Sequence, residues 1–420
     1  MERVDLMKVW FDFSLMTLLR YNSQVISLVG SCFGAIGMYN KWAILWRVSN
    51  QPSMSPSTTN VSQRLFSLDV FRGLTMFLLI AEAAGFHGNF STLAEGTWLA
   101  GLAHQLHHHP WNGLRFWDLI QPFFMFIVGV AMPFSARKRL VNGDKRAVTR
   151  HILKRCFLLF SFGVLLHCVY SHKLVWELWN VLVQLAFTIL IAYAIMQLPH
   201  KVQLAISAAL LVLTEVLYRA YNPENPYNQG ESFGSWVDML VMGKTNSGYW
   251  VFINFIPTAA HTIWGVVCGQ VLLSNRDAKG KLKSFIIWGL GILVLGLAMD
   301  VLNITPIIKR IATTSFTLAS GGIAVLVLAL FYWGIDVKGY KANWLKIFSV
   351  VGTNSIFIYL FAETVGVQWF QDFGKIWTEG LLAPIGLPQD MIMVINALFV
   401  LFIFWYLTYF LDRKKVYFKV

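Results

Sequence analysis

Four histidines stand close together just before a Pro-Trp-Asn-Gly sequence that begins at residue 110: His104, His107, His108 and His109. An imidazole titrates near neutral pH and can take a proton from an amine or a hydroxyl group, so one interpretation is a general base. Histidine runs also bind zinc, but no HExxH motif or Cys/His framework accompanies these four. A surface loop without a chemical role is the third interpretation. Spacing alone does not choose among the four histidines.

Carboxylates occur within long apolar segments, where burial in lipid is costly and a functional role is the default hypothesis. Glu82, Asp118, Glu177 and Glu363 all fall toward the half of these segments that lies beside the histidines. The alternative is that they pair across a helix bundle and fix its register. A group of carboxylates and imidazoles at one depth in the membrane favours a functional site over separate structural pairs. Other polar residues in or beside these segments are Asp69, Arg72, Arg115, Asn180, Gln184, Asn254, His261 and Asn354.

The amino-acid composition of the whole chain excludes a water-soluble protein. Of the 420 residues, 56% are hydrophobic and 13% are charged, against roughly 25% charged in soluble proteins. The mean hydropathy is +0.57. The 34 basic and 21 acidic residues give a net charge of +13, which the orientation of membrane loops explains without nucleic acid. The four cysteines have no metal-ligand or redox spacing.

Ten apolar runs are long enough to cross a bilayer, which takes about 20 residues. They lie near residues 73–90, 116–134, 152–170, 175–196, 202–218, 249–273, 285–302, 314–334, 347–367 and 391–411. A weaker run at 24–46 precedes a polar linker at 49–63. The sequence therefore predicts an all-α polytopic membrane protein, a single bundle of 10–11 transmembrane helices. We expect residues 1–63 to be an N-terminal extension and residues 64–420 to be the transmembrane domain.

The distribution of basic residues between the loops predicts the orientation in the membrane. The loop at 137–155 is strongly basic, which places it in the cytoplasm. Alternation from there places the histidine-rich stretch 87–112 on the opposite side. Lys309-Arg310 is the one basic pair that this assignment leaves on the extracytoplasmic side.

Several motifs, taken in order, resemble a known family. Residues 67–74 read SLDVFRGL, residues 108–114 read HHPWNGL, and residues 122–129 read PFFMFIVG. Further similar segments lie at 183–185, 314–316, 336–339, 352–356 and 413–419. Over residues 64–420 the ordered set is similar to the transmembrane acetyltransferases typified by heparan-α-glucosaminide N-acetyltransferase. The resemblance implies that residues 64–420 form an acyltransferase domain, which moves acetyl from cytoplasmic acetyl-CoA to a glucosamine-like amino sugar on the extracytoplasmic side.

The resemblance also implies roles for particular residues. The family's catalytic histidine lies three residues before the tryptophan of its Trp-Asn-Gly motif, which corresponds to His108. It acts as a general base or carries the acetyl group covalently. Glu82 stands where the family usually has asparagine, and unlike an amide it can accept a proton or hold a cationic amine. We expect Glu82 to face one cavity with His108 and to raise the pKa of His108. Asn112 is the expected donor to the thioester oxyanion.

A second set of residues is expected to bind the acetyl-CoA and the acceptor. Arg72, at a cytoplasmic helix start, either contacts CoA phosphates or pairs with Asp69 as a structural residue. The full set of expected binding residues is Asp69, Arg72, Trp111, Asp118, Gln184, Asn354 and Ser355. No metal is expected.

The alternative function is a proton-coupled secondary transporter of a small solute or sugar, with Glu82, Asp118 and His261 as its relay. Against it, the sequence shows no pair of equivalent halves with interrupted helices. The expected partners are an amino sugar or oligosaccharide acceptor and membrane lipid, with a homodimer left open and no nucleic acid. Weakly acidic loops and the lack of a counterpart to a folded luminal domain favour a bacterial inner membrane, with His108 facing the extracytoplasmic side.

Overall fold

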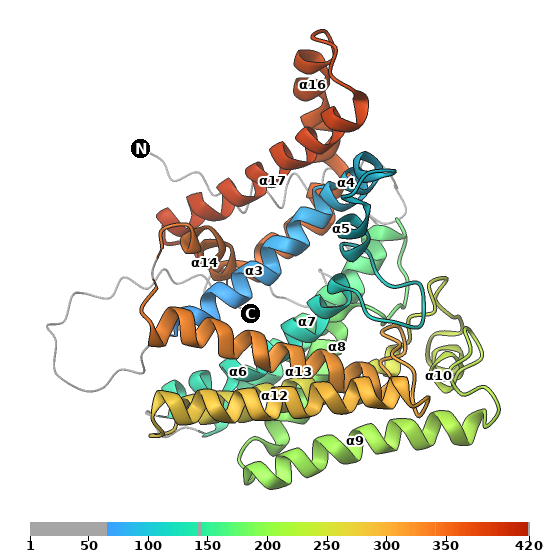
Figure 1. Ribbon diagram of the computed structural model, residues 1–420, viewed down its shortest axis with the longest axis vertical. Coiled ribbons are helices and arrows are strands. Elements are labelled where there is room, and N and C mark those ends of the chain that lie inside the picture. The colour runs from blue at the N-terminus through green and yellow to red at the C-terminus, as the bar shows by residue number, and fades with distance from the viewer. Residues whose placement is uncertain (1–64, 141–144, 341, 419–420) are drawn as a thin grey trace, which may run out of the picture. The chain divides into compact units, whose positions relative to one another are not determined.

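A computed structural model describes residues 65–140, 145–340 and 342–418, and these residues form helices joined by loops (Figure 1). They belong to one compact unit, residues 62–420. The only bridge between extended segments in the described part of the chain pairs Asn112 with Ile308. The candidate span at 24–46 and the linker at 49–63 lie outside the described residues.

The described helices follow the predicted order of apolar runs, with shorter helices in the loops between them. They are α3 (Phe66–Ala83), α4 (Phe86–Ala94), α5 (Ala100–Gln105), η2 (Phe116–Leu119), α6 (Ile120–Leu140), α7 (Lys145–Tyr170), α8 (Val181–Ile195), α9 (His200–Tyr221), α10 (Phe233–Met242), η3 (Phe252–Asn254), α11 (Phe255–Leu273), α12 (Ala278–Val301), α13 (Thr314–Phe331), η4 (Tyr332–Val337), α14 (Leu345–Thr353), α15 (Ser355–Phe361), η5 (Ala362–Phe370), α16 (Gln371–Leu382) and α17 (Gln389–Arg413).

Seven of the described helices are long and apolar enough to cross a membrane, and a pair bent by 81° brings the number to eight if it is counted as one span. The seven are built on α6, α7, α9, α11, α12, α13 and α17, and the bent pair joins α14 to the helix that follows it. This confirms an all-α polytopic membrane protein. Helices α3 and α8 coincide with two further predicted spans. However, α3 contains three ionisable residues, Asp69, Arg72 and Glu82, and α8 has only 15 residues.

The bounds of two predicted spans were wrong because local backbone features interrupt the helix. The run at 73–90 is two helices, since α3 ends at Ala83 and Gly85 takes a left-handed conformation with φ of +85°. The run at 347–367 breaks at Asn354. Its side-chain amide donates to the Val416 carbonyl (3.0 Å) and its oxygen accepts from the Phe418 amide (2.9 Å), which ties the break to the C-terminal segment.

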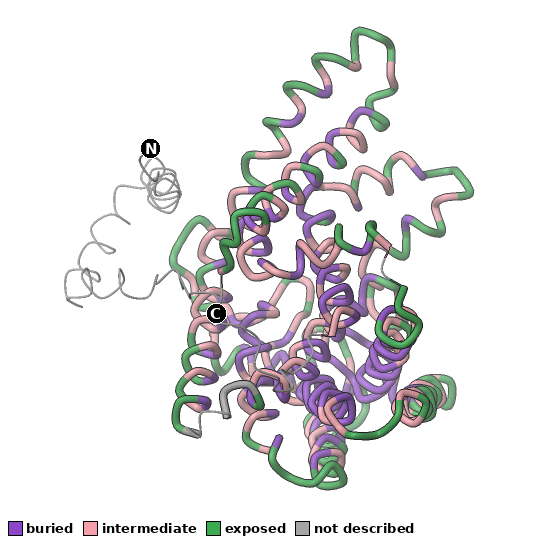
Figure 2. The backbone as a smooth tube through the Cα atoms, turned by 90° about the vertical axis from the view of Figure 1, so that its left-hand side faces the viewer, coloured by how far each residue is buried: buried purple, intermediate pink, exposed green. Residues whose placement is uncertain are grey.

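Helix α11 is the central helix of the described unit, and its glycines let α6 approach it closely. Any Cβ atom on Gly265 would collide with the Phe126 carbonyl, and any Cβ on Gly269 would collide with the Val130 carbonyl. Small residues four positions apart allow this backbone contact in helix bundles. Figure 2 shows the buried residues concentrated where the central helices meet. The packing fixes α6 and the short helix η2 before it, which carries Asp118.

Candidate active site

Three loops meet at one end of the bundle and form the site. They are the loop from α5 to α6, the loop that leads into α11, and the loop from α12 to α13. The Gly113 amide donates to the Ile307 carbonyl (2.8 Å), which joins the first loop to the third. Arg310 Nη1 donates to the Gly248 carbonyl (2.7 Å), which joins the third loop to the second. Backbone contacts therefore hold the three loops in one arrangement.

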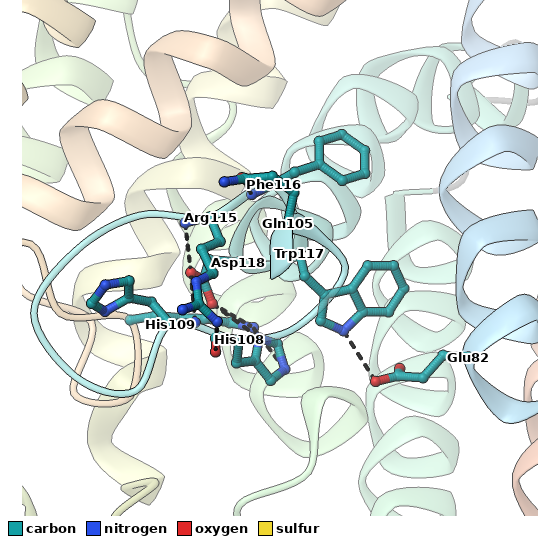
Figure 3. A network of polar contacts seen from close by, with 9 residues as sticks. Glu82, Gln105, His108, His109, Arg115, Phe116, Trp117 and Asp118 are labelled. Atoms are coloured by element: carbon teal, nitrogen blue, oxygen red, sulfur yellow. Dashed lines mark hydrogen bonds and ion pairs between the residues drawn. The ribbon is translucent and has the colours of Figure 1, made fainter. Parts of the chain in front are cut away.

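His108 and Asp118 lie at the centre of this site (Figure 3). His108 Nδ1 is 2.9 Å from Asp118 Oδ1. Asp118 Oδ2 accepts from the backbone amides of Arg115 (2.9 Å) and His109 (3.3 Å). The Asp118 side chain is only 1% exposed, and its carboxylate caps the turn that leads into α6. The start of a helix thus positions the acid that orients His108.

Lys309 completes this cluster from the loop between α12 and α13. Its Nζ atom lies 3.0 Å from Nδ1 and 3.3 Å from Nε2 of His108, and 3.9 Å from Asp118 Oδ1. The side chain is 7% exposed and its ammonium lies 5.0 Å from the centre of the Trp250 ring. The same ring meets His108 edge to face, with centroids 5.3 Å apart. A buried cation is thereby enclosed by a carboxylate and an aromatic face.

Burial and nearby charge set the protonation of this cluster. Burial lowers the pKa of His108 to about 4, and the charge of Lys309 adds to that effect against the opposing pull of Asp118. Burial likewise lowers the pKa of Lys309 to about 8, against the pull of Asp118 and Glu82. The prediction that Glu82 raises the pKa of His108 was therefore wrong, because desolvation and Lys309 dominate. At neutral pH His108 is uncharged and can accept a proton.

Glu82 joins the site through Trp117 rather than through His108. Trp117 Nε1 donates to Glu82 Oε1 (3.1 Å), and Trp117 immediately precedes Asp118 (Figure 3). Glu82 is exposed although its neighbours Ala81 and Ala83 are buried. Its carboxylate therefore faces an accessible space beside the cluster. Glu82 forms no ion pair with the nearby basic residue Arg115, whose Nη1 donates to the His108 carbonyl (3.2 Å).

Two of the other carboxylates at this depth have partners of their own. Glu177 contacts Lys244 Nζ (2.6 Å) and His167 Nδ1 (2.6 Å), which forms a separate ion-pair cluster. Glu363 accepts from the Tyr170 hydroxyl (2.7 Å) and lies near enough to Glu82 to act on it electrostatically. Glu177 thus belongs to a separate ion-pair cluster, whereas Glu363 lies near Glu82.

The predicted substrate-binding residues lie in several parts of the structure, and only some of them share a loop with His108. Trp111 and Asn112 lie on the His108 loop, where Trp111 packs against Tyr249 and Asn112 is exposed. Gln184 bonds to Gln121. Ser355 begins α15, next to the Asn354 break.

Asp69 and Arg72 form an ion pair of 3.0 Å on α3. Asp69 also lines a cavity of about 270 Å³ together with Ser349, Thr353 and Asp412. Two carboxylates make that cavity unsuited to phosphate, so an anion would have to approach Arg72 from elsewhere. Among the described residues no three His, Cys, Asp or Glu side chains are grouped to hold a metal ion.

Lys309 and Trp250 are the site residues that sequence reasoning missed. The sequence did contain a signal for Lys309. Lys309-Arg310 was the one basic pair that the loop charges left on the extracytoplasmic side. A charge that violates the loop pattern needs a local partner, and His108 and Asp118 supply it.

The fold and this cluster define a class: a polytopic helical membrane protein with a buried histidine–carboxylate–lysine site at one end of its bundle. Residues 64–296 match the family model for "Heparan-alpha-glucosaminide N-acetyltransferase, catalytic". The match covers more than half of the chain, so the protein belongs to this family, as the motifs indicated.

Two curated relatives are similar over most of the chain. Heparan-alpha-glucosaminide N-acetyltransferase of Mus musculus is 25% identical over 449 aligned residues, covering 88% of this chain and 62% of the relative. The Homo sapiens protein of the same name is 24% identical over 449 residues, covering 89% of this chain and 61% of the relative. The chain thus spans about three fifths of the length of these curated relatives.

Proposed function

We propose that the protein transfers an acetyl group from acetyl-CoA to the amine of an amino sugar, with His108 as the group that handles the proton. The observation that carries the proposal is the His108–Asp118 contact of 2.9 Å in a site where His108 is uncharged at neutral pH. The names of the relatives supply the substrate class, because both are N-acetyltransferases of an amino sugar. Acetyl-CoA as donor follows from the family.

Asp118 determines which nitrogen of His108 can act as the base. The carboxylate accepts from Nδ1–H, so the neutral ring carries its proton on Nδ1 and its lone pair on Nε2. During transfer the amine nitrogen bonds to the thioester carbonyl carbon and the carbon–sulfur bond breaks. Nε2 takes the proton that the amine loses and returns it to the departing thiolate. In the covalent variant, Nε2 first attacks the same carbon and the thiolate leaves. The amine then attacks the acetyl carbon, the bond from that carbon to Nε2 breaks, and Nε2 takes the proton that the amine loses.

Glu82 is the proposed acceptor-binding group beside this base, and the buried Trp117 holds its carboxylate in place. A carboxylate that faces an accessible space can hold the ammonium of an amino sugar before His108 removes its proton. Asn112 is kept as the proposed oxyanion donor, since its exposed side chain lies on the loop that carries His108.

The donor is proposed to enter from the other end of α3, which the loop charges place in the cytoplasm. The guanidinium groups of Arg72 and Arg155 lie near enough to act on each other electrostatically. Arg155 Nε is buried and has no hydrogen-bond partner among the described residues. Two adjacent guanidinium groups at this end of the bundle are suited to binding phosphate groups. The pantetheine arm would then reach toward His108 through the bundle.

The transporter alternative lacks a continuous relay in this structure. His261 is fully buried on α11, and its Nε2 lies 3.0 Å from both the Thr317 carbonyl and the Ser320 hydroxyl. These contacts join α11 to α13 and involve neither Glu82 nor Asp118. His261 is thus explained as a structural residue.

The test is a screen of amino sugars with acetyl-CoA that measures release of free thiol by the purified protein. We expect His108→Ala to reduce transfer by at least about 10²-fold, the lower range for a lost general base. His109→Ala is the matched control and should be mild, since only the backbone amide of His109 contacts Asp118. Wild-type turnover in a folded His108→Ala protein would refute the assignment. Failure of every amino sugar with wild-type protein would refute the substrate class.

A further inference from the structure

Lys309 is held in place by its own loop before any substrate binds. The Thr313 hydroxyl accepts from the Ile308 amide (3.0 Å) and donates to the Pro306 carbonyl (2.7 Å), and the Thr313 amide donates to the Ile308 carbonyl (3.1 Å). These bonds close the turn that contains Lys309. Its position beside His108 is therefore a property of the folded loop and not of a flexible side chain that happens to reach there.

The hydrogen-bonding capacity of the three groups allows only one consistent arrangement. A lysine ammonium only donates, and a carboxylate only accepts. His108 Nδ1 cannot donate to Asp118 and accept from Lys309 at the same time, although both atoms lie within 3.0 Å of it. With the proton on Nδ1, the ammonium lies over the ring, 3.0 Å from Nδ1 and 3.3 Å from Nε2, where its charge opposes a second proton on the ring. A protonated imidazole would place a second positive charge directly against Lys309.

We propose that Lys309 is a positioning residue for His108, whose ammonium keeps the imidazole uncharged and its proton on the side of Asp118. The catalytic importance of Lys309 rests on the proposed function, in which His108 is the base.

The other charged groups around His108 do not replace Lys309. Asp118 acts in the opposite direction, and Arg310 adds a smaller effect of the same sign as Lys309. Arg310 is also engaged elsewhere, since Nη1 bonds to Gly248 and its guanidinium carbon lies 5.7 Å from the Trp250 ring centre.

The imidazole of His87 also faces this region, and it supplies no charge that could replace Lys309. His87 on α4 interacts electrostatically with both His107 and His108. Its own pKa is lowered to about 4, chiefly by burial, so it is uncharged at neutral pH. Removal of the Lys309 charge therefore leaves Asp118 as the dominant charged neighbour and should raise the pKa of His108.

The direct test measures protonation of His108 without any transfer activity. Diethyl pyrocarbonate modifies uncharged imidazole, and the His108 side chain is 33% exposed, so the reagent has access. Modification of the full-length protein in detergent is followed from pH 4 to 8 and assigned to His108 by peptide fragmentation. We expect the wild-type midpoint well below the ordinary histidine value of about 6.5. Lys309→Met and Lys309→Gln should raise it by at least about one unit, whereas Lys309→Arg should stay near wild type.

Lys375→Met is the matched control, because it removes a lysine that pairs with Asp372 on α16, outside the three loops of the site, and should leave the His108 midpoint unchanged. A wild-type midpoint near 6.5 would overturn the proposal whether or not any variant folds. An unchanged midpoint in folded Lys309→Met would do the same. If the midpoint shifts but wild-type protein acetylates no amino sugar, the role of Lys309 stands and the proposed function fails. If transfer occurs and the midpoint does not shift, only the role of Lys309 fails.

Discussion

Replacing Asp118 by asparagine tests whether the carboxylate orients His108. The carboxylate accepts three N–H groups, from His108 Nδ1 (2.9 Å), the Arg115 amide (2.9 Å) and the His109 amide (3.3 Å). Asparagine offers one acceptor oxygen and one donor group in the same space. If its oxygen faces the backbone amides, its NH₂ group faces Nδ1 and forces the imidazole proton onto Nε2. If the amide is reversed, two backbone N–H groups lose their acceptor.

The magnitude follows from these contacts and from the charge that Asp118 balances. A hydrogen bond to a charged group contributes about 1.5–3 kcal/mol. Lys309 would also lose the carboxylate that lies 3.9 Å away, and removal of one partner of a buried pair costs about 3–5 kcal/mol. These contributions overlap, so we expect Asp118→Asn to reduce the free energy of unfolding by about 3–5 kcal/mol. Transfer should fall by about 10²–10⁴-fold, because the lone pair no longer points to the amine.

The assay is thiol release at saturating acetyl-CoA, normalised to folded protein by thermal unfolding in detergent. Asp238→Asn is the matched control. Asp238 is another fully buried carboxylate, which accepts from Trp179 Nε1 (2.7 Å) and from the Phe252 amide (2.9 Å). It should lower stability and leave turnover per folded molecule nearly unchanged. Wild-type turnover by folded Asp118→Asn would show that the carboxylate does not orient His108.

Two further predictions concern the donor and the orientation in the membrane. Arg72→Ala should weaken CoA binding by about 1.5–3 kcal/mol, the contribution of a charge-assisted contact, and leave acceptor affinity alone. Lys375→Ala, which breaks only an exposed ion pair, is its control, and unchanged CoA affinity in folded Arg72→Ala would assign Arg72 to structure. In a chain without its native cysteines, Arg146→Cys should react with an impermeant thiol reagent only from the cytoplasm. Gly101→Cys, where a Cβ meets open space, should react only from the opposite side, and labelling of both from one side would contradict the topology.

The sequence alone determined the class of fold, and the physical reason is local. Backbone polar groups in lipid must bond within their own segment, so long apolar runs have to become helices. The runs that became α6, α9, α11 and α17 were accordingly found with small errors at their ends. The sequence also singled out His108 through its spacing to the tryptophan of the following motif, and its role as the base stays a prediction.

Interruptions within the helical segments were harder to locate from the sequence. Gly85 ends the first span early through a positive φ, which many glycines in the chain do not adopt. Asn354 looked like a ligand for substrate, but its amide and carbonyl are used by the C-terminal segment. A polar residue within an apolar run predicts that a partner exists and does not say whether that partner is substrate or protein.

The partners of His108 differ in how far along the chain they lie. Asp118 is 10 positions away and caps the next helix, so the sequence contained most of that contact. Lys309 is 201 positions away and reaches His108 only because the loops before α6 and α13 bond to each other. Glu82 was expected at the imidazole, yet it bonds to Trp117. Periodicity and hydropathy specify which segments are helices, whereas the packing of those helices decides which side chains meet. The protonation of His108 depends on that packing, since burial and a lysine from a distant loop set it.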